Sequence, residues 1–255
     1  MGAAVAARLA GGTRRLIVAD VNVSAAQRIA NDLPGSVEAV RCDLSVDGDI
    51  DAVVEAASEV GSLVITAGLS PTMAAGRRIF EVNLRGMAYA VQAFEAIAGA
   101  GSVGVIFASS AAHMAPVVPA LDAVLDDPFS PTFFEDLARA GIDVDEPGGA
   151  YSFAKRGVVR LAARSAGAWG AKGARLVSLS PGIVETPMGR LELENQPMMQ
   201  AMIDATAIGR MLTADEVAAA AAFLLSDAAS GITGTDLLVD GGGVAGVAQM
   251  MAALG

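Results

Sequence analysis

The sequence predicts an α/β fold in which a parallel β-sheet is covered by helices on both faces. Short β-branched segments alternate along the chain with longer segments that have the periodicity of helices. Several of the predicted strands are continuously apolar, as strands buried on both faces are. Small polar or acidic residues follow these strands, and ligands of such sheets bind beyond the carboxyl ends of the strands.

The predicted elements follow one another in a regular order. Helices of ten or more residues between strands imply parallel crossover connections. Strands are expected at 15–20, 37–42, 63–66, 103–107, 174–179 and 236–240. Helices are expected at 3–10, 24–33, 46–60, 80–98, 150–169 and 214–226, with Ser24 as a candidate N-cap and Gly61 ending the third helix.

Length, charge and cysteine content limit the classes of function. A chain of 255 residues can form a single α/β domain, here expected over residues 1–255. The net charge of −11 argues against a nucleic-acid partner. One cysteine, Cys42, excludes an internal disulfide and suits the cytoplasm, and the longest apolar stretches are too short to cross a membrane. We expect no metal site.

One long segment, at about 114–148, interrupts the alternation of strands and helices. It carries five prolines and two candidate short helices, at 119–125 and 133–140. A connection of this length is usually a functional loop or lid. A surface elaboration or an interface element is an equally good interpretation.

Tyr151 and Lys155 are spaced to carry a proton transfer. Four residues apart on a predicted helix, they lie on one face, one turn apart. A tyrosine has a pKa near ~10, and an adjacent ammonium group lowers it. Such a pair could exchange a proton with a substrate hydroxyl. The spacing alone is weak evidence, because it occurs by chance in many helices.

Four further features follow the same order as in a known enzyme family. Asn83 lies in the helix after the third strand, Ser110 ends the fourth strand, and the segments 181–188 (PGIVETPM) and 236–243 (DLLVDGGG) follow later. With Tyr151 and Lys155, these residues make the chain resemble the short-chain dehydrogenase/reductase family over almost its whole length. The resemblance implies a Rossmann-type doubly wound sheet and a dinucleotide-binding oxidoreductase.

The resemblance implies a role for each catalytic candidate. Tyr151 matches the general acid/base, and Lys155 matches the residue that lowers its pKa and binds the nicotinamide ribose. Ser110 matches the residue that orients the substrate carbonyl, and Asn83 the one that holds a water beside the lysine. Hydride transfer leaves charge on one oxygen, to which Ser110 and Tyr151 would both donate.

The cofactor contacts implied by the resemblance come from the ends of several strands. The candidates are Gly2, Asp43 and Leu44, Ala67 and Gly68, Pro181 and Gly182, and Val184 and Thr186, together with Tyr151 and Lys155. Asp20 ends a strand where an acid would bind both ribose hydroxyls and repel a 2′-phosphate. We therefore expect NAD rather than NADP. The alternative for Asp20 is an acid that caps the following helix.

The beginning of the sequence departs from the family pattern. The family opens with a strand and a glycine-rich turn that brings the pyrophosphate to a helix N-terminus. Here Gly2 resembles the last glycine of that turn, and the first strand is absent. Either residues upstream of Met1 are missing from the sequence or the chain is a natural fragment, and the first explanation is preferred. In both cases two neighbouring strands would lack a ladder partner.

These features predict an NAD-dependent oxidoreductase that interconverts a secondary alcohol and a ketone on a small hydrophobic substrate. The insertion resembles that of the 3α-hydroxysteroid dehydrogenase/carbonyl reductase branch, where it covers a helix face otherwise used for dimerisation, so a hydroxysteroid is one candidate. Met188, Met198, Met199 and Met202 suit an apolar substrate or ordinary helix packing. A carbonyl or acyl-thioester reductase of smaller substrates and a non-catalytic cofactor-binding scaffold are the alternatives. We expect a homo-oligomer, either a dimer or a tetramer.

Overall fold

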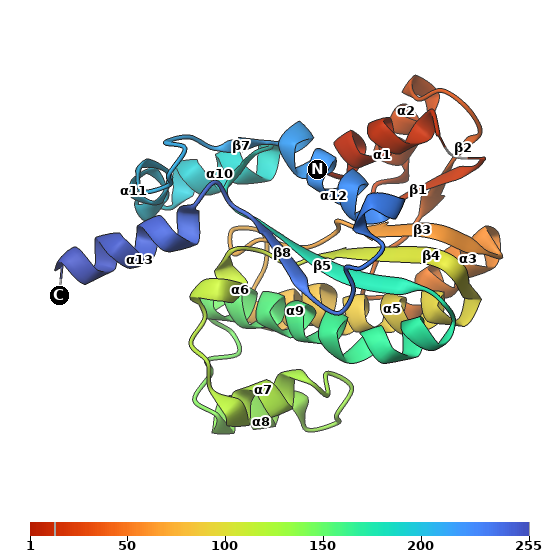
Figure 1. Cartoon of the computed structure of the whole chain (residues 1–255). Coiled ribbons are helices and arrows are strands. Elements are labelled where there is room, and N and C mark those ends of the chain that lie inside the picture. Colours follow the sequence, from red (N-terminus) through yellow and green to blue (C-terminus); the bar gives the residue numbers. More distant parts are fainter. Residues whose placement is uncertain (13, 255) are drawn as a thin grey trace.

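A four-stranded parallel sheet lies at the centre of the computed structural model, which describes residues 1–12 and 14–254 (Figure 1). Its order is β3 (Val60–Ile65), β4 (Ala98–Phe107), β5 (Arg175–Pro181) and β8 (Asp236–Val239). All three ladders are parallel, which confirms the predicted α/β class. Because the strands are parallel, their carboxyl ends meet at one edge of the sheet.

Side chains on the two faces of the sheet belong to different apolar clusters. Val105 and Phe107 of β4 pack in the cluster that includes α1 (Gly2–Ala10) and α12 (Ala214–Leu225). Ile106 points the other way, into the cluster with α3 (Asp47–Ala57), α5 (Met87–Ile97) and α9 (Pro147–Ala171). This alternation explains the continuously apolar sequence of the strand. Figure 1 shows α5 and α9 below the sheet and α1 and α12 above it.

The strands β1 (Leu16–Asp20) and β2 (Val37–Arg41) form a separate two-stranded parallel sheet. Within the described residues, no ladder joins β1 to β3. This is the interruption expected when the family's first strand is absent. Neither β1 nor β2 contains a fully buried residue, and α2 (Val23–Asp32) packs against both.

Two predicted helix boundaries were wrong. The N-cap of α2 is Asn22, not Ser24, because the Asn22 side chain accepts a hydrogen bond from the Ala25 amide at 3.0 Å. Helix α3 ends at Ala57, where Ser58 adopts a positive φ of 57°, and Gly61 lies inside β3 instead of ending the helix.

Where one helix was predicted at 80–98, the structure has three consecutive helical segments that begin at Gly76. These are α4 (Gly76–Phe80), a π-helical turn (Glu81–Gly86) and α5. A Cβ atom at Gly86 would overlap the carbonyl group of Leu44, so glycine lets this turn approach the loop after β2. Single π-turns inside helices are frequent at functional sites, and this one carries Asn83.

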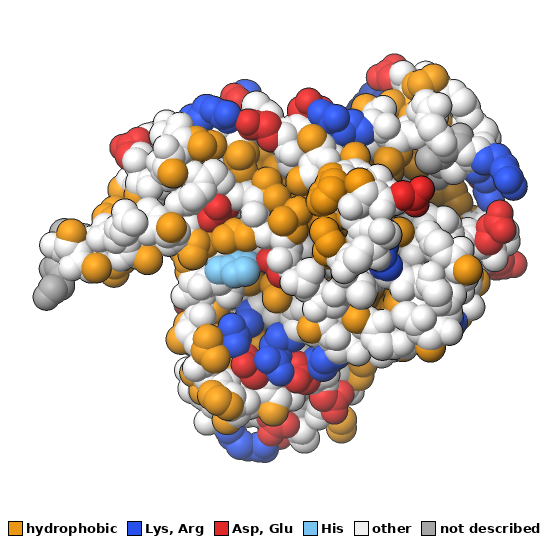
Figure 2. Space-filling model, viewed as in Figure 1, with side chains coloured by type: hydrophobic (Ala, Val, Ile, Leu, Met, Phe, Trp, Pro, Cys, Tyr) orange, Lys and Arg blue, Asp and Glu red, His pale blue; other side chains and the backbone are white. Residues whose placement is uncertain are grey.

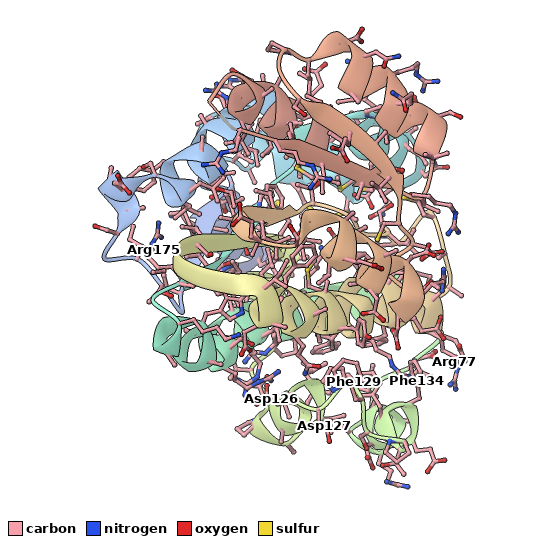
Figure 3. The ribbon with its side chains drawn as sticks, turned by 90° about the vertical axis from the view of Figure 1, so that its right-hand side faces the viewer. Arg77, Asp126, Asp127, Phe129, Phe134 and Arg175 are labelled. Carbon is pink, nitrogen blue, oxygen red and sulfur yellow. The ribbon has the colours of Figure 1, made fainter. Side chains whose placement is uncertain are left out.

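The insertion packs against the outer side of α9. It contains α7 (Pro119–Leu125) and α8 (Phe133–Arg139), as predicted, and follows the short helix α6 (Ala111–Met114), which was not predicted. Leu121 and Leu125 of α7 are buried in the same apolar cluster as α9. Figure 3 shows Phe134 of α8 beside Arg77, whose guanidinium carbon lies 5.0 Å from the ring centre.

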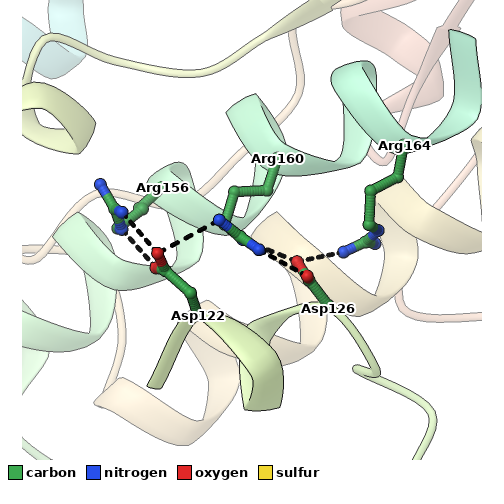
Figure 4. Close-up of polar contacts among 5 residues, drawn as sticks. All are labelled: Asp122, Asp126, Arg156, Arg160 and Arg164. Atoms are coloured by element: carbon green, nitrogen blue, oxygen red, sulfur yellow. Dashed lines mark hydrogen bonds and ion pairs between the residues drawn. The ribbon is translucent and has the colours of Figure 1, made fainter. Parts of the chain in front are cut away.

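Ion pairs join α7 to α9 along the seam where the insertion packs against this helix. Asp122 pairs with Arg156 and Arg160, and Asp126 pairs with Arg160 and Arg164 (Figure 4). The seam appears in Figure 2 as a row of basic and acidic side chains. The three arginines follow one another at intervals of four residues, so one face of α9 presents all of them to α7.

The remaining elements follow β5. They are β6 (Val184–Glu185), α10 (Pro187–Asn195), α11 (Met198–Asp204), β7 (Leu212–Thr213), a 3-10 turn (Asp227–Ala229) and α13 (Gly243–Leu254). In Figure 1, α13 extends outward from the body of the molecule. None of the helices in the described ranges is long and apolar enough to span a membrane.

Candidate active site

The predicted site residues lie at or just beyond the carboxyl ends of the parallel strands, or on helices that face this edge. Asp20 ends β1, Asp43 and Leu44 follow β2, Ala67 and Gly68 follow β3, Ser110 follows β4, and Pro181 and Gly182 stand at the end of β5. Val184 lies in β6, Thr186 caps α10, Gly2 begins α1, Asn83 lies in the π-turn, and Tyr151 and Lys155 lie in α9.

Helix α9 brings Tyr151 and Lys155 to the sheet. Its N-terminus is capped by Glu146, whose carboxylate accepts hydrogen bonds from the Gly148 and Gly149 amides at 2.7 and 2.6 Å. The Lys155 ammonium group is buried and donates to the carbonyl oxygen of Phe107 at 2.8 Å. Its nitrogen lies 5.9 Å from the ring centre of Tyr151, so the structure brings this pair together as predicted.

Burial dominates the protonation of this pair. It raises the pKa of Tyr151 to about 12, although the Ser109 hydroxyl opposes the rise, and the Glu192 carboxylate adds to it. Burial also lowers the pKa of Lys155 to about 8. The lowering of the Tyr151 pKa that we expected from Lys155 is not seen in this structure, where desolvation is the largest cause and raises the pKa.

Gly68 packs directly against Asn83 and Lys155. The fully buried Asn83 side chain accepts from the Leu69 amide at 2.7 Å and donates to the Leu69 carbonyl at 2.8 Å. A Cβ atom at Gly68 would lie 3.1 Å from Asn83 Oδ1 and 3.4 Å from Lys155 Nζ. Asn83 thus fixes the loop after β3 against the lysine, a role that its sequence position alone did not indicate.

Ser109 and Ser110 occupy different places. The Ser109 hydroxyl lowers the pKa of Tyr151, and it accepts a 3.2 Å hydrogen bond from the Ala111 amide. Ser110, the predicted residue, is the N-cap of α6, and its amide donates to the Pro181 carbonyl at 2.8 Å. Ser110 also lines a cavity with Gly182, which places it where a substrate oxygen could be bound.

The cavity beside Ser110 is small, about 10 Å³, and its lining is mainly apolar, with Thr206 and Asp240 as further polar or charged side chains. Side chains from four elements or loops line it, namely Met114, Ile183, Met202, Val244 and Val247. Of the methionines singled out in the sequence, Met202 therefore contributes to the cavity, whereas Met199 is buried and Met198 is 57% exposed.

His113 is a structural residue. Its Nε2 lies 2.8 Å from the Asp236 carboxylate, whose other oxygen accepts hydrogen bonds from Ser178 and Ser180. This network connects α6 to β5 and β8 behind Ser110. His113 is thus held in place on α6 by this network, and it is not among the residues that line the cavity.

Two acids mark the predicted adenosine side of the site. Asp20 is exposed, and one of its oxygens accepts from the Asn22 amide at 2.8 Å, as a residue beside a helix cap would. Asp43 accepts from the Ser45 amide and hydroxyl, and these bonds, with Arg78 and Arg41, keep its pKa below the usual range. Asp43 thus stabilises its own loop. Asp20 uses one carboxylate oxygen to accept from the Asn22 amide, and its second oxygen does not take part in that hydrogen bond.

The residues present fit a nicotinamide cofactor. Lys155 has three N–H donors and uses one on Phe107, which leaves two for ribose hydroxyls. Gly2 places the N-terminus of α1 against Thr66 at the end of β3, since a Cβ there would lie 2.7 Å from the threonine hydroxyl. Thr186 accepts from the Gly189 amide at 3.1 Å and so sets the start of α10 beside Val184.

Glu192 was not identified from the sequence. It lies on α10, and its carboxyl oxygen Oε1 is buried. Only its three-dimensional position distinguishes it from Glu194, an exposed acid of the same helix.

Comparisons with known proteins agree with this geometry. A family model described as enoyl-(acyl carrier protein) reductase matches residues 138–243. A short-chain dehydrogenase/reductase from Alternaria brassicicola is 34% identical over 208 residues, which cover 76% of this chain and 74% of the relative. D-threitol dehydrogenase from Mycolicibacterium smegmatis is 32% identical over 259 residues, which cover 95% of this chain and 88% of the relative.

The branch indicated by the insertion is also represented. The 3-alpha-hydroxysteroid dehydrogenase/carbonyl reductase of Comamonas testosteroni is 30% identical over 203 residues, which cover 75% of this chain and 76% of the relative. Among solved structures, a short-chain glucose/ribitol dehydrogenase from Brucella melitensis matches with a TM-score of 0.75 and 23% identity, over 94% of this chain and 90% of that chain. At this identity the match shows the shared fold.

Proposed function

Because the chain belongs to the short-chain dehydrogenase/reductase family, we propose that it interconverts a secondary alcohol and the corresponding ketone with NAD as the hydride carrier. The observation that supports this most directly is the buried Lys155 beside Tyr151, with its ammonium group on the Phe107 carbonyl. A surface pair at the same spacing would not be desolvated or fixed in this way.

Each residue of the site has a distinct part in this reaction. In alcohol oxidation Tyr151 accepts the hydroxyl proton, and Ser110 donates a hydrogen bond to the same oxygen as it becomes a carbonyl. Lys155 holds the cofactor ribose and supplies positive charge near the phenolate. Asn83 holds the loop that packs against this lysine. When bound, the nicotinamide supplies the hydride acceptor.

The cofactor is proposed to be NAD because of Asp20. A carboxylate at the end of this strand binds two ribose hydroxyls and repels a 2′-phosphate. One Asp20 oxygen is engaged by the Asn22 amide, and the exposed carboxylate has a second oxygen for the ribose. Replacement by Asn should remove the repulsion, so Asp20→Asn is expected to raise the ratio of NADP-linked to NAD-linked activity.

The substrate is proposed to have a hydrophobic body. The apolar side chains around the small cavity beside Ser110 support this, and a hydroxysteroid is one candidate. Among the relatives, one is named for a polyol, D-threitol, and another for a hydroxysteroid. A panel of hydroxysteroids, cyclic alcohols, small ketones and acyl thioesters, each with NAD(H) and NADP(H), would separate the dehydrogenase from a reductase of smaller substrates.

The decisive variant is Tyr151→Phe. Loss of the general base is expected to lower kcat/KM for the best alcohol by about 10²- to 10⁴-fold. Tyr89→Phe is the matched control, since Tyr89 is the only other tyrosine and bonds to Asp51 away from the site. If the Tyr151 variant stays within a few-fold of wild type, the proposal is wrong. If NADH binds but no substrate of the panel turns over, the scaffold interpretation is favoured.

A further inference from the structure

The side chains of His113 and Asp236 join two segments that are far apart in the sequence. The imidazole Nε2 of His113 lies 2.8 Å from one oxygen of the Asp236 carboxylate, whose side chain is 7% exposed. A carboxylate has no hydrogen to donate, so Nε2 carries the hydrogen of this bond. Among the described residues, His113 is the only basic side chain that pairs with Asp236. The bond therefore attaches α6 to the first residue of β8.

The other oxygen of the Asp236 carboxylate is held by β5. It accepts hydrogen bonds from the Ser178 and Ser180 hydroxyls at 2.6 and 3.0 Å, and both serines are fully buried. Hydrogen bonds to a charged acceptor are stronger than those between neutral groups. The carboxylate is thus fixed from two sides, and it gives the His113 side chain a firm point of attachment.

These bonds close a ring that includes the backbone of Ser110. The Ser110 amide donates to the Pro181 carbonyl at 2.8 Å, and the His113 amide donates to the Ser110 carbonyl at 3.0 Å. Pro181 follows Ser180 in β5, and the Ser180 hydroxyl bonds to Asp236. From Asp236 the ring returns to α6 through the His113 side chain. Ser110 is therefore held both at its amide and at its carbonyl group.

The short helix α6 depends on contacts of this kind. It has four residues, and a single turn of helix has little stability of its own. Ser110 and Met114, at its two ends, line the cavity, whereas His113 does not. His113 therefore affects the cavity only through the backbone of α6.

We propose that His113 is a positioning residue for the reaction, because its bond to Asp236 fixes Ser110 where its hydroxyl donates to the substrate oxygen. The inference rests on the proposed alcohol dehydrogenase function. A displacement of about 1 Å at a reacting group can lower a rate by about 100-fold. Loss of the bond between His113 and Asp236 is therefore expected to slow the reaction although neither side chain touches the reacting atoms.

The experiment compares two amide replacements of the histidine in the oxidation of the best alcohol of the panel. The amide nitrogen in His113→Gln reaches about as far as Nε2 and can donate to Asp236, whereas that in His113→Asn is one methylene group too short. We expect His113→Gln to keep kcat within about threefold of wild type and His113→Asn to lower it by about 10- to 100-fold. Thr233→Ala is the control, because it removes a hydroxyl that bonds to Leu176 at the opposite end of β5 and should leave kcat unchanged.

A double-mutant cycle tests whether His113 acts through Ser110. In Ser110→Ala no hydroxyl remains to be positioned, so adding His113→Asn should lower kcat by less than about threefold. An unchanged kcat in His113→Asn overturns the inference. Equal losses in His113→Gln and His113→Asn do so as well, and so does a double variant that shows the full product of the two single losses.

A separate measurement distinguishes failure of this inference from failure of the proposed function. If the wild-type chain oxidises no alcohol of the panel with NAD or NADP, the proposed function fails. Hydrogen exchange then tests the attachment by itself, because the Ser110 amide should exchange faster in His113→Asn than in wild type or His113→Gln. Equal exchange rates in all three chains contradict the positioning role.

Discussion

The ammonium group of Lys155 lies 2.8 Å from the carbonyl oxygen of Phe107, in a buried position where α9 meets the end of β4. This bond positions the charge beside Tyr151, but burial lowers the pKa of Lys155 to about 8. The site therefore retains a positive charge at neutral pH at a cost in stability.

That cost predicts a particular pH dependence of stability. The folded chain releases the Lys155 proton near pH 8, whereas the unfolded chain keeps it until about pH 10.5, so the unfolded state binds more protons and stability rises with pH. Relative to Lys155→Met, the wild-type free energy of unfolding should increase by roughly 2 kcal/mol between pH 7 and 10. Urea titrations at several pH values measure it, and a constant difference would contradict the assignment.

Glu192 should also tune the pH dependence of the reaction. Its negative charge raises the pKa of Tyr151, although burial is the larger cause. In Glu192→Gln the phenolate is easier to form, so the rise of alcohol oxidation with pH should move to lower pH. Profiles of log(kcat/KM) against pH would detect the shift. Glu194→Gln should leave the profile unchanged, and an unchanged or upward-shifted profile in Glu192→Gln would contradict this prediction.

The two neighbouring serines should differ in their effect on catalysis. Ser110 lines the cavity, whereas the Ser109 hydroxyl lowers the pKa of Tyr151 and accepts a hydrogen bond from the Ala111 amide. If Ser110 binds the substrate oxygen, Ser110→Ala should lower kcat by about 10²- to 10³-fold. Ser109→Ala should lower it by less than about 10-fold, the effect of one neutral hydrogen bond. The reverse order of effects would assign the substrate contact to Ser109.

The ion pairs of the insertion should differ in their contribution to stability. Asp122 is 7% exposed and forms bonds of 2.6 and 2.7 Å to one guanidinium group, that of Arg156. Removing one partner of a buried pair leaves the other uncompensated, so Asp122→Ala should reduce the free energy of unfolding by about 3 kcal/mol. Glu135→Ala, which breaks an exposed pair with Arg139, should cost less than about 1 kcal/mol. Denaturant titration distinguishes the two.

Periodicity predicted the order of strands and helices well, but failed where local contacts set the boundaries. The apolar pattern across 80–98 suits a continuous helix, and the π-turn arises where Asn83 bonds to the backbone of Leu69 fourteen residues earlier. Likewise, Gly61 reads as a helix terminator, whereas Ser58 already ends α3 and the glycine is accommodated in β3. Contacts of this range leave no periodic signal in the sequence.

The sequence predicted the catalytic residues of the site but not the residues whose role depends on packing between distant segments. Tyr151, Lys155 and Ser110 stand in an order along the chain that indicates their roles, and the structure gathers them at one edge of the sheet. Nothing in the sequence separates Glu192 from Glu194, because only the folded structure buries a carboxyl oxygen of Glu192 and leaves Glu194 exposed. Asp43 was expected to contact the cofactor, and its bonds to Ser45 show a structural use that spacing does not reveal.

The interrupted sheet has a consequence for local opening of the molecule. The β1–β2 pair has no ladder to β3 within the described residues and no fully buried side chain, whereas β5 is hydrogen-bonded on both sides and buried along most of its length. The amide hydrogens of β1 and β2 should therefore exchange with solvent deuterium through small fluctuations, and those of β5 only through global unfolding. Asp20 would sit on the most easily opened part of the chain, so ribose binding at this residue would slow exchange there first.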